Sequence, residues 1–515
     1  MDSQYTPRRS ENYHEAPPRK RLRRTFIDRF GTVAMLLLLL ASAFLIFQLY
    51  RSQMLEKIWL YVIIGVLALF NIIQMIVQLP LRRNKLGKFI FGLIAIVLSA
   101  GMLYASIATG SVQNAISKIS GMLMQKEVTS VIVMADDPAQ SIEDAGDYTF
   151  GYLKDTADDI MQDLYQQTKQ QIGHEISTTS YASPAELAEA LYKGEVGAIL
   201  LHRGYISVLE KNDQFKTFST DTRILCEYTT ERQIVKDNSQ KLDVAKPFVV
   251  YCSGIDARQS DINAKSLSDV NIIAAVNPQT HEIVLINTPR DYYIPLNFNG
   301  EMDKLTHAGI YGIDESMAVL SDLYGVDIDY YVRVNFNGLV NIVDALGGID
   351  VDSEYEFTTR KMVIPDETGE DFYWDSFSFT EGTNHLNGRQ ALAFSRERYS
   401  FALGDIQRGK NQMAVIKAIV SKATSPSVLS NYRDLLHAVS DAFITNLTYD
   451  DIAALVKMQE KDMSGWHISS FTVSGESGAE DTYTGAYAYV MYQDPELIAE
   501  AKDMIANVIN PSNPE

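Results

Sequence analysis

The sequence has little cysteine and, beyond its N-terminal part, little positive charge. Only Cys226 and Cys252 occur in 515 residues. An oxidising compartment would allow a bridge between them, but a chain of this length does not need one, so we predict two buried thiols. Residues 1–109 hold 14 Lys and Arg against 5 Asp and Glu, whereas the other 406 residues hold 31 against 60. So acidic a surface argues against nucleic acid as a partner.

The sequence also has no internal repeat and no low-complexity block, and three runs near its start almost lack charge. The runs span Val33–Tyr50, Ile58–Leu79 and Phe89–Ala108, which is 18, 22 and 20 residues. Each is long enough to cross a bilayer core of about 30 Å as a helix. Three such runs in succession leave no polar face for water, and the polar tail ahead of them argues against a cleaved signal peptide. We therefore predict three membrane-spanning helices within residues 31–109.

Basic residues are unevenly placed around these runs and predict their orientation. The tail, residues 1–30, holds eight Lys and Arg residues, and the loop after the second run, residues 81–88, holds four. The loop after the first run holds only two. Because basic loops stay on the cytoplasmic side, we expect the tail and the second loop in the cytoplasm. Three crossings then place everything after about residue 109 outside, in a multi-pass protein of the cell membrane.

The segment after the spans divides into two predicted domains, of which the first is a small α/β unit at residues 127–242. It opens with a β-branched strand at 128–135 and continues with helical spacing at 154–171. Ser183 is a suitable N-cap for a second helix, and residues 205–211 alternate as a strand does. No group of catalytic residues stands out, so we predict an accessory role.

The second predicted domain, residues 246–515, alternates strands and helices. The predicted strands share short apolar, β-branched runs that end in loops, and they are 247–256, 270–278, 281–291 and 349–357. The predicted helices share apolar spacings of three and four, and they are 317–325, 335–348 and 408–423. Such alternation indicates an α/β fold, a sheet covered by helices on both faces, with functional residues at the strand ends.

Two carboxylates at strand ends could together hold a hard cation. Asp256 follows an apolar strand, with Gly254 letting the backbone turn, and Asp269 precedes the next strand. Their oxygens are ligands of the kind that Mg²⁺ prefers, with Mn²⁺ as the alternative ion. Either residue would also serve as a turn or cap residue, and their spacing does not decide between the two roles.

Arg290 and Asp291 come directly after the third strand of the domain. They form either a solvated salt bridge or a phosphate clamp beside an acid or base, and the sequence leaves both open. Lys304 and His307 follow soon after. A lone histidine is more often structural than catalytic, so we assign His307 no role.

The stretch AFSRERYSFALGDIQRGKNQMAVIKAI, residues 393–419, concentrates positive charge in an acidic chain. Residues 394–400 are interpreted as a strand, which would project Arg396 and Arg398 to one side. Arginine suits phosphate binding, because its planar fork bonds two oxygens at once and it never deprotonates.

Asp405 then suits an N-cap or first-turn position of a helix. Arg408 and Gln412 lie three and seven positions further on, which puts all three on one helical face. The strand and the helix would thus aim guanidinium groups at the loop between them. On this pattern alone, a phosphate site and a surface salt-bridge network remain equal alternatives.

Six blocks that occur in order carry a resemblance to a known family. They are GID…SDVNIIAAVNP, INTPRDYYIPL, KLTHAGIYG, YYVRVNFNGLVNIVDALGGIDVD, LNGRQALAFSRER and GDIQRGKNQMAVIKAI. Over roughly residues 247–424 the chain resembles the LytR–CpsA–Psr (LCP) family of Gram-positive envelope phosphotransferases. The resemblance implies an α/β/α sandwich with a mixed central sheet, which transfers a glycosyl-phosphate polymer from a polyprenyl-pyrophosphate carrier to peptidoglycan. Three spans and an extra α/β unit look most like CpsA-type members, which implies capsular polysaccharide as the polymer.

The resemblance also implies roles for single residues. By motif position, Asp256 and Asp269 would hold Mg²⁺ on the pyrophosphate, and Asp405 would orient the arginines. The residues that would bind the pyrophosphate oxygens are Arg290, Lys304, Arg396, Arg398, Arg408 and Gln412. The residues that would be catalytic are Asp291, as proton acceptor, Arg290 and Arg398.

The chain departs from the family pattern at Leu267, where the family commonly has arginine. That removes one expected phosphate contact, for which Arg258 would substitute. The apolar helices 336–347 and 412–421 are the expected walls of a groove for the prenyl chain.

A membrane regulator or scaffold of capsule assembly, without turnover, is the alternative function. The basic tail could contact a partner, although it also serves as a topogenic signal. Asn71, Gln74 and Gln78 share a face of the second run and could contact either capsule-assembly proteins or neighbouring helices. The other expected partners are the lipid-linked polysaccharide, peptidoglycan and membrane lipid.

Overall fold

The computed structural model divides into two compact units, Met1–Gly110 and Ser111–Glu515. The described residues are 26–52, 57–78, 85–120, 124–233, 242–255, 262, 265–365, 372–425, 428, 442–485 and 487–510. Four predicted features lie outside them: the tail before residue 26, residues 81–84 of the second loop, Asp256 and Arg258.

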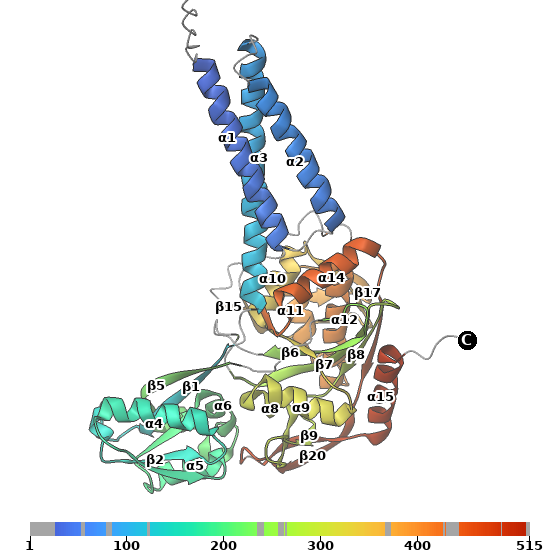
Figure 1. The fold of residues 1–515 in the computed structure, drawn as a ribbon. Helices are drawn as coiled ribbons and strands as arrows, with labels where there is room; N and C mark the ends of the chain where they lie inside the picture. Colours follow the sequence, from blue (N-terminus) through green and yellow to red (C-terminus); the bar gives the residue numbers. More distant parts are fainter. Residues whose placement is uncertain are drawn as a thin grey trace, which may run out of the picture. The chain divides into compact units, whose positions relative to one another are not determined.

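The first unit contains three long apolar helices (Figure 1). They are α1 (Phe26–Ser52), α2 (Lys57–Gln78) and α3 (Lys85–Ser120), of which α3 continues past Gly110 into the second unit. The segments long and apolar enough to cross a membrane are Phe26–Tyr50, Ile58–Gln78 and Lys85–Ile107. The prediction of three spans is confirmed, and the protein is anchored in a membrane by its N-terminal part.

Polar side chains join these helices to one another. Asn71 Nδ2 of α2 donates a hydrogen bond to Ser42 Oγ of α1 over 3.0 Å. Gln78 Nε2 donates to the backbone carbonyl of Lys88 in α3, also over 3.0 Å. Lys88 Nζ in turn lies 2.7 Å from Asp28 Oδ1 of α1. The polar face of α2 was expected to contact either capsule-assembly proteins or neighbouring helices. Asn71 and Gln78 contact neighbouring helices.

The second unit begins with a five-stranded mixed sheet in the order β3-β2-β4-β1-β5. Its strands are β1 (Met124–Met134), β2 (Thr149–Leu153), β3 (Ser177–Tyr181), β4 (Ala198–His202) and β5 (Thr222–Gln233). Its helices are α4 (Asp158–Ile172), α5 (Pro184–Tyr192), α6 (Ile206–Leu209) and α7 (Phe218–Asp221), with 3₁₀ turns at Glu143–Ala145, Arg203–Tyr205 and Asp213–Phe215. We call residues 124–233 the accessory unit.

Two predictions about the accessory unit have different outcomes. Ser183 caps α5 as predicted, because its side chain accepts the backbone N–H of Glu186. The prediction of a strand at 205–211 is wrong, since Tyr205, Val208 and Leu209 are buried together at helical spacing and α6 forms there. A run this short fits one turn of helix as well as a strand, so its period does not separate the two.

The larger sheet has six strands in the order β18-β11-β6-β7-β8-β19. They are β6 (Phe248–Ile255), β7 (Ser268–Asn277), β8 (Glu282–Asn287), β11 (Tyr330–Asn335), β18 (Phe443–Thr445) and β19 (His467–Thr472). Strand β6 runs parallel to β11 and β8 parallel to β19, while the other pairs are antiparallel. The implied mixed sheet is confirmed.

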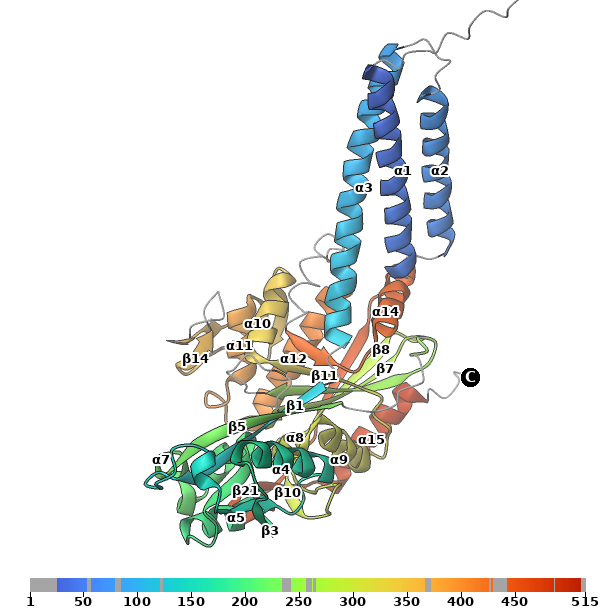
Figure 2. The same ribbon diagram turned by 60° about the vertical axis from the view of Figure 1, so that its left-hand side comes forward.

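Helices lie on both sides of this sheet (Figures 1 and 2). One side carries α8 (Leu305–Tyr311), α9 (Ile313–Tyr324) and α15 (Pro495–Ile509), and the other carries α10 (Phe336–Ala345), α11 (Gly388–Arg396), α12 (Asp405–Ala423) and α14 (Tyr449–Asp462). Along β6, Val249 and Tyr251 pack toward the first set, whereas Phe248 and Val250 pack toward α12 and α14. This alternation buries both faces and gives the predicted α/β/α sandwich.

Five two-stranded sheets decorate the sandwich. They pair β9 (Tyr293–Pro295) with β10 (Met302–Lys304), β12 (Ile349–Ser353) with β17 (Gly382–Leu386), β13 (Phe357–Thr358) with β16 (Ser378–Phe379), β14 (Met362–Pro365) with β15 (Phe372–Asp375), and β20 (Gly475–Asp481) with β21 (Tyr487–Gln493).

The interpretation of residues 394–400 as a strand is wrong. Asn387 and Gln390 form a reciprocal capping box that starts α11, and the helix runs to Arg396. Arg398 therefore lies in the loop after the helix and not on a strand. The helix that follows was predicted correctly, with Asp405 as its first residue.

Candidate active site

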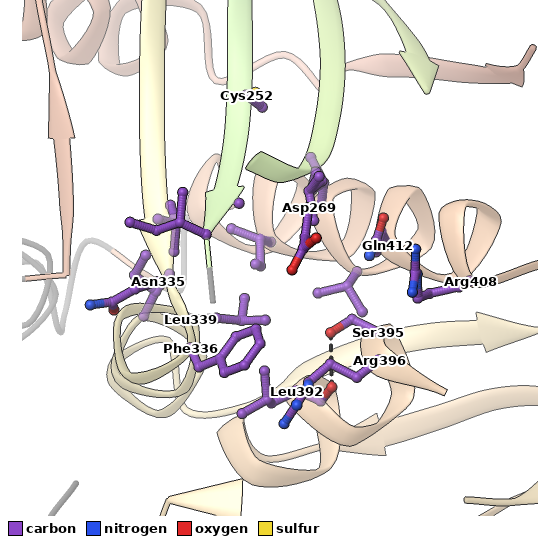
Figure 3. Close-up of a pocket in the computed structure, with 18 of the residues that line it drawn as sticks. Cys252, Asp269, Asn335, Phe336, Leu339, Leu392, Ser395, Arg396, Arg408 and Gln412 are labelled. Atoms are coloured by element: carbon purple, nitrogen blue, oxygen red, sulfur yellow. Dashed lines mark hydrogen bonds between the residues drawn. The ribbon is translucent and has the colours of Figure 1, made fainter. Parts of the chain in front are cut away.

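A groove of about 770 Å³ opens where the carboxyl ends of β6 and β11 meet α10, α11 and α12 (Figure 3). Apolar side chains from these three helices form much of its lining: Phe336, Leu339, Ile342, Leu392, Val415, Ile416 and Ile419. We call this cavity the apolar groove. The prediction that helices 336–347 and 412–421 wall a groove is confirmed.

Charged and polar side chains line the same groove. They are Asp269 of β7, Arg290 after β8, Arg396 of α11, Arg398 after α11, and Arg408 and Gln412 of α12. Figure 3 shows four of them, Asp269, Arg396, Arg408 and Gln412, around one space. The structure thus brings together six of the predicted site residues from five different segments. We call the four arginines the guanidinium cluster.

Arg290 lies at the centre of a chain of ion pairs at the end of β8. Its Nη1 is 2.6 Å from Asp269 Oδ1, and its Nε is 3.6 Å from Asp291 Oδ2. Lys304 Nζ lies 3.0 Å from Asp291 Oδ1. Asp291 and Lys304 are each 13% exposed, so water screens their attraction less than it would at the surface.

Asp405 joins two members of the guanidinium cluster. Its Oδ1 lies 3.3 Å from Arg398 Nη1 and 3.1 Å from Arg408 Nη1. The next residue, Gly409, lets α12 approach the end of β8, because a Cβ there would lie 2.1 Å from Asn287 Nδ2. The implied task of Asp405, to orient arginines, matches this geometry.

Arg396 is held by elements far away in the sequence. Its Nη1 donates a hydrogen bond of 2.8 Å to the backbone carbonyl of Val363 in β14. Its guanidinium carbon also lies 4.1 Å from the ring centroid of Phe336, the first residue of α10. A stacked guanidinium keeps its plane fixed, which prepares it for an anion.

Three further residues lie at the groove that were not predicted from the sequence. Arg398 Nη2 donates to Tyr399 Oη over 2.6 Å, and Arg360 stacks 4.1 Å from the Tyr399 ring centroid. Glu397 is 1% exposed and accepts the backbone N–H groups of Arg360, Tyr399 and Ser400. The strand interpretation turned Glu397 away from the site, and no sequence signal places Arg360 beside it.

The guanidinium cluster is electrostatically strained. Burial lowers the pKa of Arg408, and the nearby Arg290 lowers it further, although Asp405 acts in the opposite direction. Burial also lowers the pKa of Arg290, but Asp269 and Asp291 outweigh that effect and the net shift is upward. Both groups stay charged, so an anion placed between them would relieve their repulsion.

A second cavity of about 290 Å³ adjoins the apolar groove, because Asp269, Arg290 and Arg398 line both. Its other lining residues are Lys211, Asp291, Lys304, Thr306, His307, Asp405 and Tyr489. We call it the polar chamber. His307 is paired with Asp303 through Nδ1 and Oδ1 over 2.6 Å, which fits the structural role expected of it.

Asp269 is the member of the predicted metal pair that the structure describes. Among the residues that the structure describes, no group of three or more His, Cys, Asp and Glu side chains could hold a metal ion. Asp269 lines both cavities, and one carboxylate completed by phosphate oxygens and water is a donor set that suits Mg²⁺. Asp256 lies outside the described residues, so the pair stays a prediction.

The two cysteines are free thiols, as predicted, although each is half-buried. Cys252 lines the apolar groove, where burial raises the pKa of its thiol to about 12. It therefore stays a neutral thiol at physiological pH and is a poor nucleophile or metal ligand. Leu267, the departure from the family pattern, packs against an apolar cluster that joins Leu209 of the accessory unit to Ile310 of α8.

Three comparisons relate the chain to known proteins. Residues 214–504 match the LytR_cpsA_psr family. The polyisoprenyl-teichoic acid–peptidoglycan teichoic acid transferase TagU of Enterococcus faecalis is 35% identical over 225 residues, which are 44% of this chain and 69% of that protein. The TagU of Bacillus mycoides is 32% identical over 218 residues, 42% of this chain and 66% of that protein. Among solved structures, protein gbs0355 from Streptococcus agalactiae has a TM-score of 0.43 and 25% identity, covering 52% of this chain and 90% of that chain. The chain therefore belongs to the LytR_cpsA_psr family.

Proposed function

We propose that this protein transfers a glycosyl-phosphate polymer from a polyprenyl-pyrophosphate carrier to peptidoglycan. The observation that carries the proposal is the apolar groove that opens onto the guanidinium cluster. A prenyl chain suits the apolar wall and a pyrophosphate suits partly buried arginines, so a molecule with both parts matches the whole cavity. The names of the TagU relatives, transferases between polyisoprenyl-linked teichoic acid and peptidoglycan, support the same classes of donor and acceptor.

In the proposed reaction, an acceptor hydroxyl attacks the phosphate that carries the sugar. A new O–P bond forms, the bridging P–O bond breaks, and polyprenyl phosphate leaves. Attacking and leaving oxygens lie roughly in line, so with the prenyl chain in the apolar groove the hydroxyl approaches from the polar chamber. Asp291 lines that chamber, fixed by Lys304, and would accept the hydroxyl proton.

The guanidinium cluster would stabilise the charge of the transition state. Negative charge grows on the non-bridging and leaving oxygens, and donors already aimed at them need no reorganisation. The ion pairs of Asp405 with Arg398 and Arg408 support this preorganisation. Asp269, with Asp256, would hold a Mg²⁺ ion, which neutralises phosphate charge when bound.

The proposal extends to the polymer and to the side of the membrane. The three spans and the accessory unit favour capsular polysaccharide as the polymer, with a scaffold of capsule assembly as the alternative. The distribution of basic residues around the spans favours a cytoplasmic N-terminus and an extracellular active site.

Turnover by the purified full chain in lipid nanodiscs tests the proposal. The substrates are a polyprenyl-pyrophosphate-linked capsular repeat and peptidoglycan, and the product measured is polyprenyl phosphate. Arg398→Ala should be slower by about 100-fold, because it removes a donor to the transition state. Arg203→Ala, which removes a half-exposed arginine of the accessory unit, should match the wild type.

The scaffold alternative predicts a different outcome. A wild-type protein that binds the lipid-linked polymer but releases no polyprenyl phosphate is a scaffold, and Arg398→Ala then lowers only its affinity. A parallel reaction with a teichoic-acid donor decides the polymer, since faster turnover of that donor contradicts the capsular assignment.

A further inference from the structure

The accessory unit contributes a residue to the polar chamber. Lys211 follows α6 and lines the chamber together with Asp269, Arg290 and Lys304. It precedes the segment that matches the family, which begins at residue 214. The other nine lining residues lie between residues 269 and 489. The chamber is therefore built by two parts of the chain, of which only one carries the family blocks.

The position of Lys211 is fixed through its neighbour in the chain. Asn212 Nδ2 donates a hydrogen bond of 2.8 Å to the backbone carbonyl of Gly485, in the turn between β20 and β21. Gly485 has φ +86°, and a Cβ there would lie 2.2 Å from Ala185 Cβ of α5. The accessory unit thus touches the hairpin that carries Tyr489, another lining residue of the chamber.

Buried contacts hold the accessory unit against the sandwich beside this point. The rings of Tyr205 and Tyr311 lie 6.0 Å apart, and Ile310 of α8 belongs to the apolar cluster of α5 and α6. Glu127 and Lys265 form an ion pair of 2.6 Å with side chains only 9% and 11% exposed. These contacts therefore hold the segment that carries Lys211 beside the chamber.

Of the residues that the structure describes, four cationic side chains, Lys211 among them, and three carboxylates line the chamber. Each of the three carboxylates that line it has a cation within 4 Å: Asp269 with Arg290, Asp291 with Lys304, and Asp405 with Arg398. Within the described part of the chain, no carboxylate lies within 4 Å of the Lys211 ammonium. Partial burial lowers the pKa of Lys211, with Asp269 opposing the shift.

We propose that Lys211 binds the phosphate group that is transferred, so that the accessory unit forms part of the substrate site. This inference rests on the proposed function. With the prenyl chain in the apolar groove, the first phosphate meets the residues shared by the two cavities, and the sugar-linked phosphate lies further toward the chamber. There, among the described lining cations, the Lys211 ammonium is the one that is not paired with any of the three lining carboxylates. Ammonium groups bind phosphate as point charges.

Binding of two short probes to the full chain in nanodiscs tests the inference. Geranyl pyrophosphate has a second phosphate in place of the sugar-linked one, whereas geranyl monophosphate lacks it. Lys211→Ala should weaken geranyl pyrophosphate about tenfold, as expected for a hydrogen bond between charged groups, and leave the monophosphate unchanged. Unchanged binding of the monophosphate shows that Lys211→Ala is folded, and Lys211→Arg, which keeps the positive charge, should retain most of the pyrophosphate affinity.

A matched control comes from the same unit. Lys193→Ala removes a lysine that is 56% exposed and paired with Glu189, so it should leave both affinities unchanged. Equal binding of geranyl pyrophosphate by wild type and Lys211→Ala overturns this inference alone, as does an equal loss for the two probes. A wild type that binds neither probe overturns the proposed function as well.

Discussion

Asp405 offers a test of whether the guanidinium cluster works by geometry or by charge alone. Its Oδ1 lies 3.3 Å from Arg398 and 3.1 Å from Arg408, at the first turn of α12. Asp405→Asn keeps the shape and one neutral acceptor but removes the negative charge that holds both arginines. Two effects then oppose each other, because the arginines lose their orientation while the site becomes more positive.

The magnitudes separate these effects. Asp405 is 30% and Arg398 33% exposed, so their ion pair contributes at most about 1 kcal/mol to folding. Arg408 is only 13% exposed, but an asparagine oxygen can still accept a hydrogen bond from it, so the variant should stay folded. A hydrogen bond between charged groups is worth about 1.5–3 kcal/mol, and losing one in the transition state lowers kcat roughly 10- to 100-fold. KM should stay unchanged or fall, since removing a carboxylate does not weaken ground-state binding of an anion.

Steady-state turnover with polyprenyl phosphate as the measured product gives kcat and KM separately. Asp375→Asn is the matched control, because Asp375 forms a 3.0 Å pair with Arg389 and lines neither cavity. A kcat within about twofold of the wild type refutes the orienting role of Asp405. A raised KM with unchanged kcat also refutes it, and assigns Asp405 to binding.

Two further predictions concern stability. His202 is buried, and desolvation lowers its pKa to about 4. In the unfolded chain its pKa is near 6.5, so the unfolded chain binds the proton first as the pH falls. Up to about 3 kcal/mol of stability is therefore lost between about pH 6.5 and pH 4. In His202→Asn the amide oxygen can still accept the Gly204 N–H, but no group at this position titrates in this range. Urea unfolding at both pH values should therefore show a smaller loss of stability for this variant than for the wild type. Equal losses contradict His202 as the titrating group. Gly338→Ala places a Cβ 2.0 Å from the Ala442 backbone oxygen. This overpacking destabilises the protein by up to about 3 kcal/mol, which exceeds the gain of about 1 kcal/mol from the higher helix propensity of alanine. The melting temperature of Gly338→Ala should fall by several degrees. That of Gly465→Ala should not fall, because a Cβ there meets no atom within 4 Å. Equal melting temperatures for the two variants refute the clash.

The local part of the site was accessible from the sequence because it follows one helical face. Arg408 and Gln412 lie where the 3.6-residue period places them, and Asp405 begins the helix as its residue type suggests. The error at 394–400 has a local cause as well. The two-residue alternation of arginines predicted a strand, whereas the structure has a helix that the capping box of Asn387 and Gln390 starts.

The non-local part of the site was not accessible from one sequence. The Arg396 guanidinium stacks on the Phe336 ring and donates a hydrogen bond to the Val363 carbonyl. No spacing along the chain predicts that these segments meet. The same holds for Lys211, which lies 58 positions before Asp269 yet lines the same chamber. The family blocks located the sandwich but contain no residue of the accessory unit, so they carried no information about its share in the chamber.

The three side chains common to both cavities have a thermodynamic consequence. Asp269, Arg290 and Arg398 face the apolar groove and the polar chamber at once, so a ligand in one cavity changes the field and the free donors in the other. Donor and acceptor binding are then linked functions with one coupling free energy. Whatever factor the lipid-linked donor imposes on acceptor affinity, the acceptor imposes on the donor. Well below both dissociation constants, the fraction of protein that holds both substrates therefore differs from the product of the two separate occupancies by that same factor.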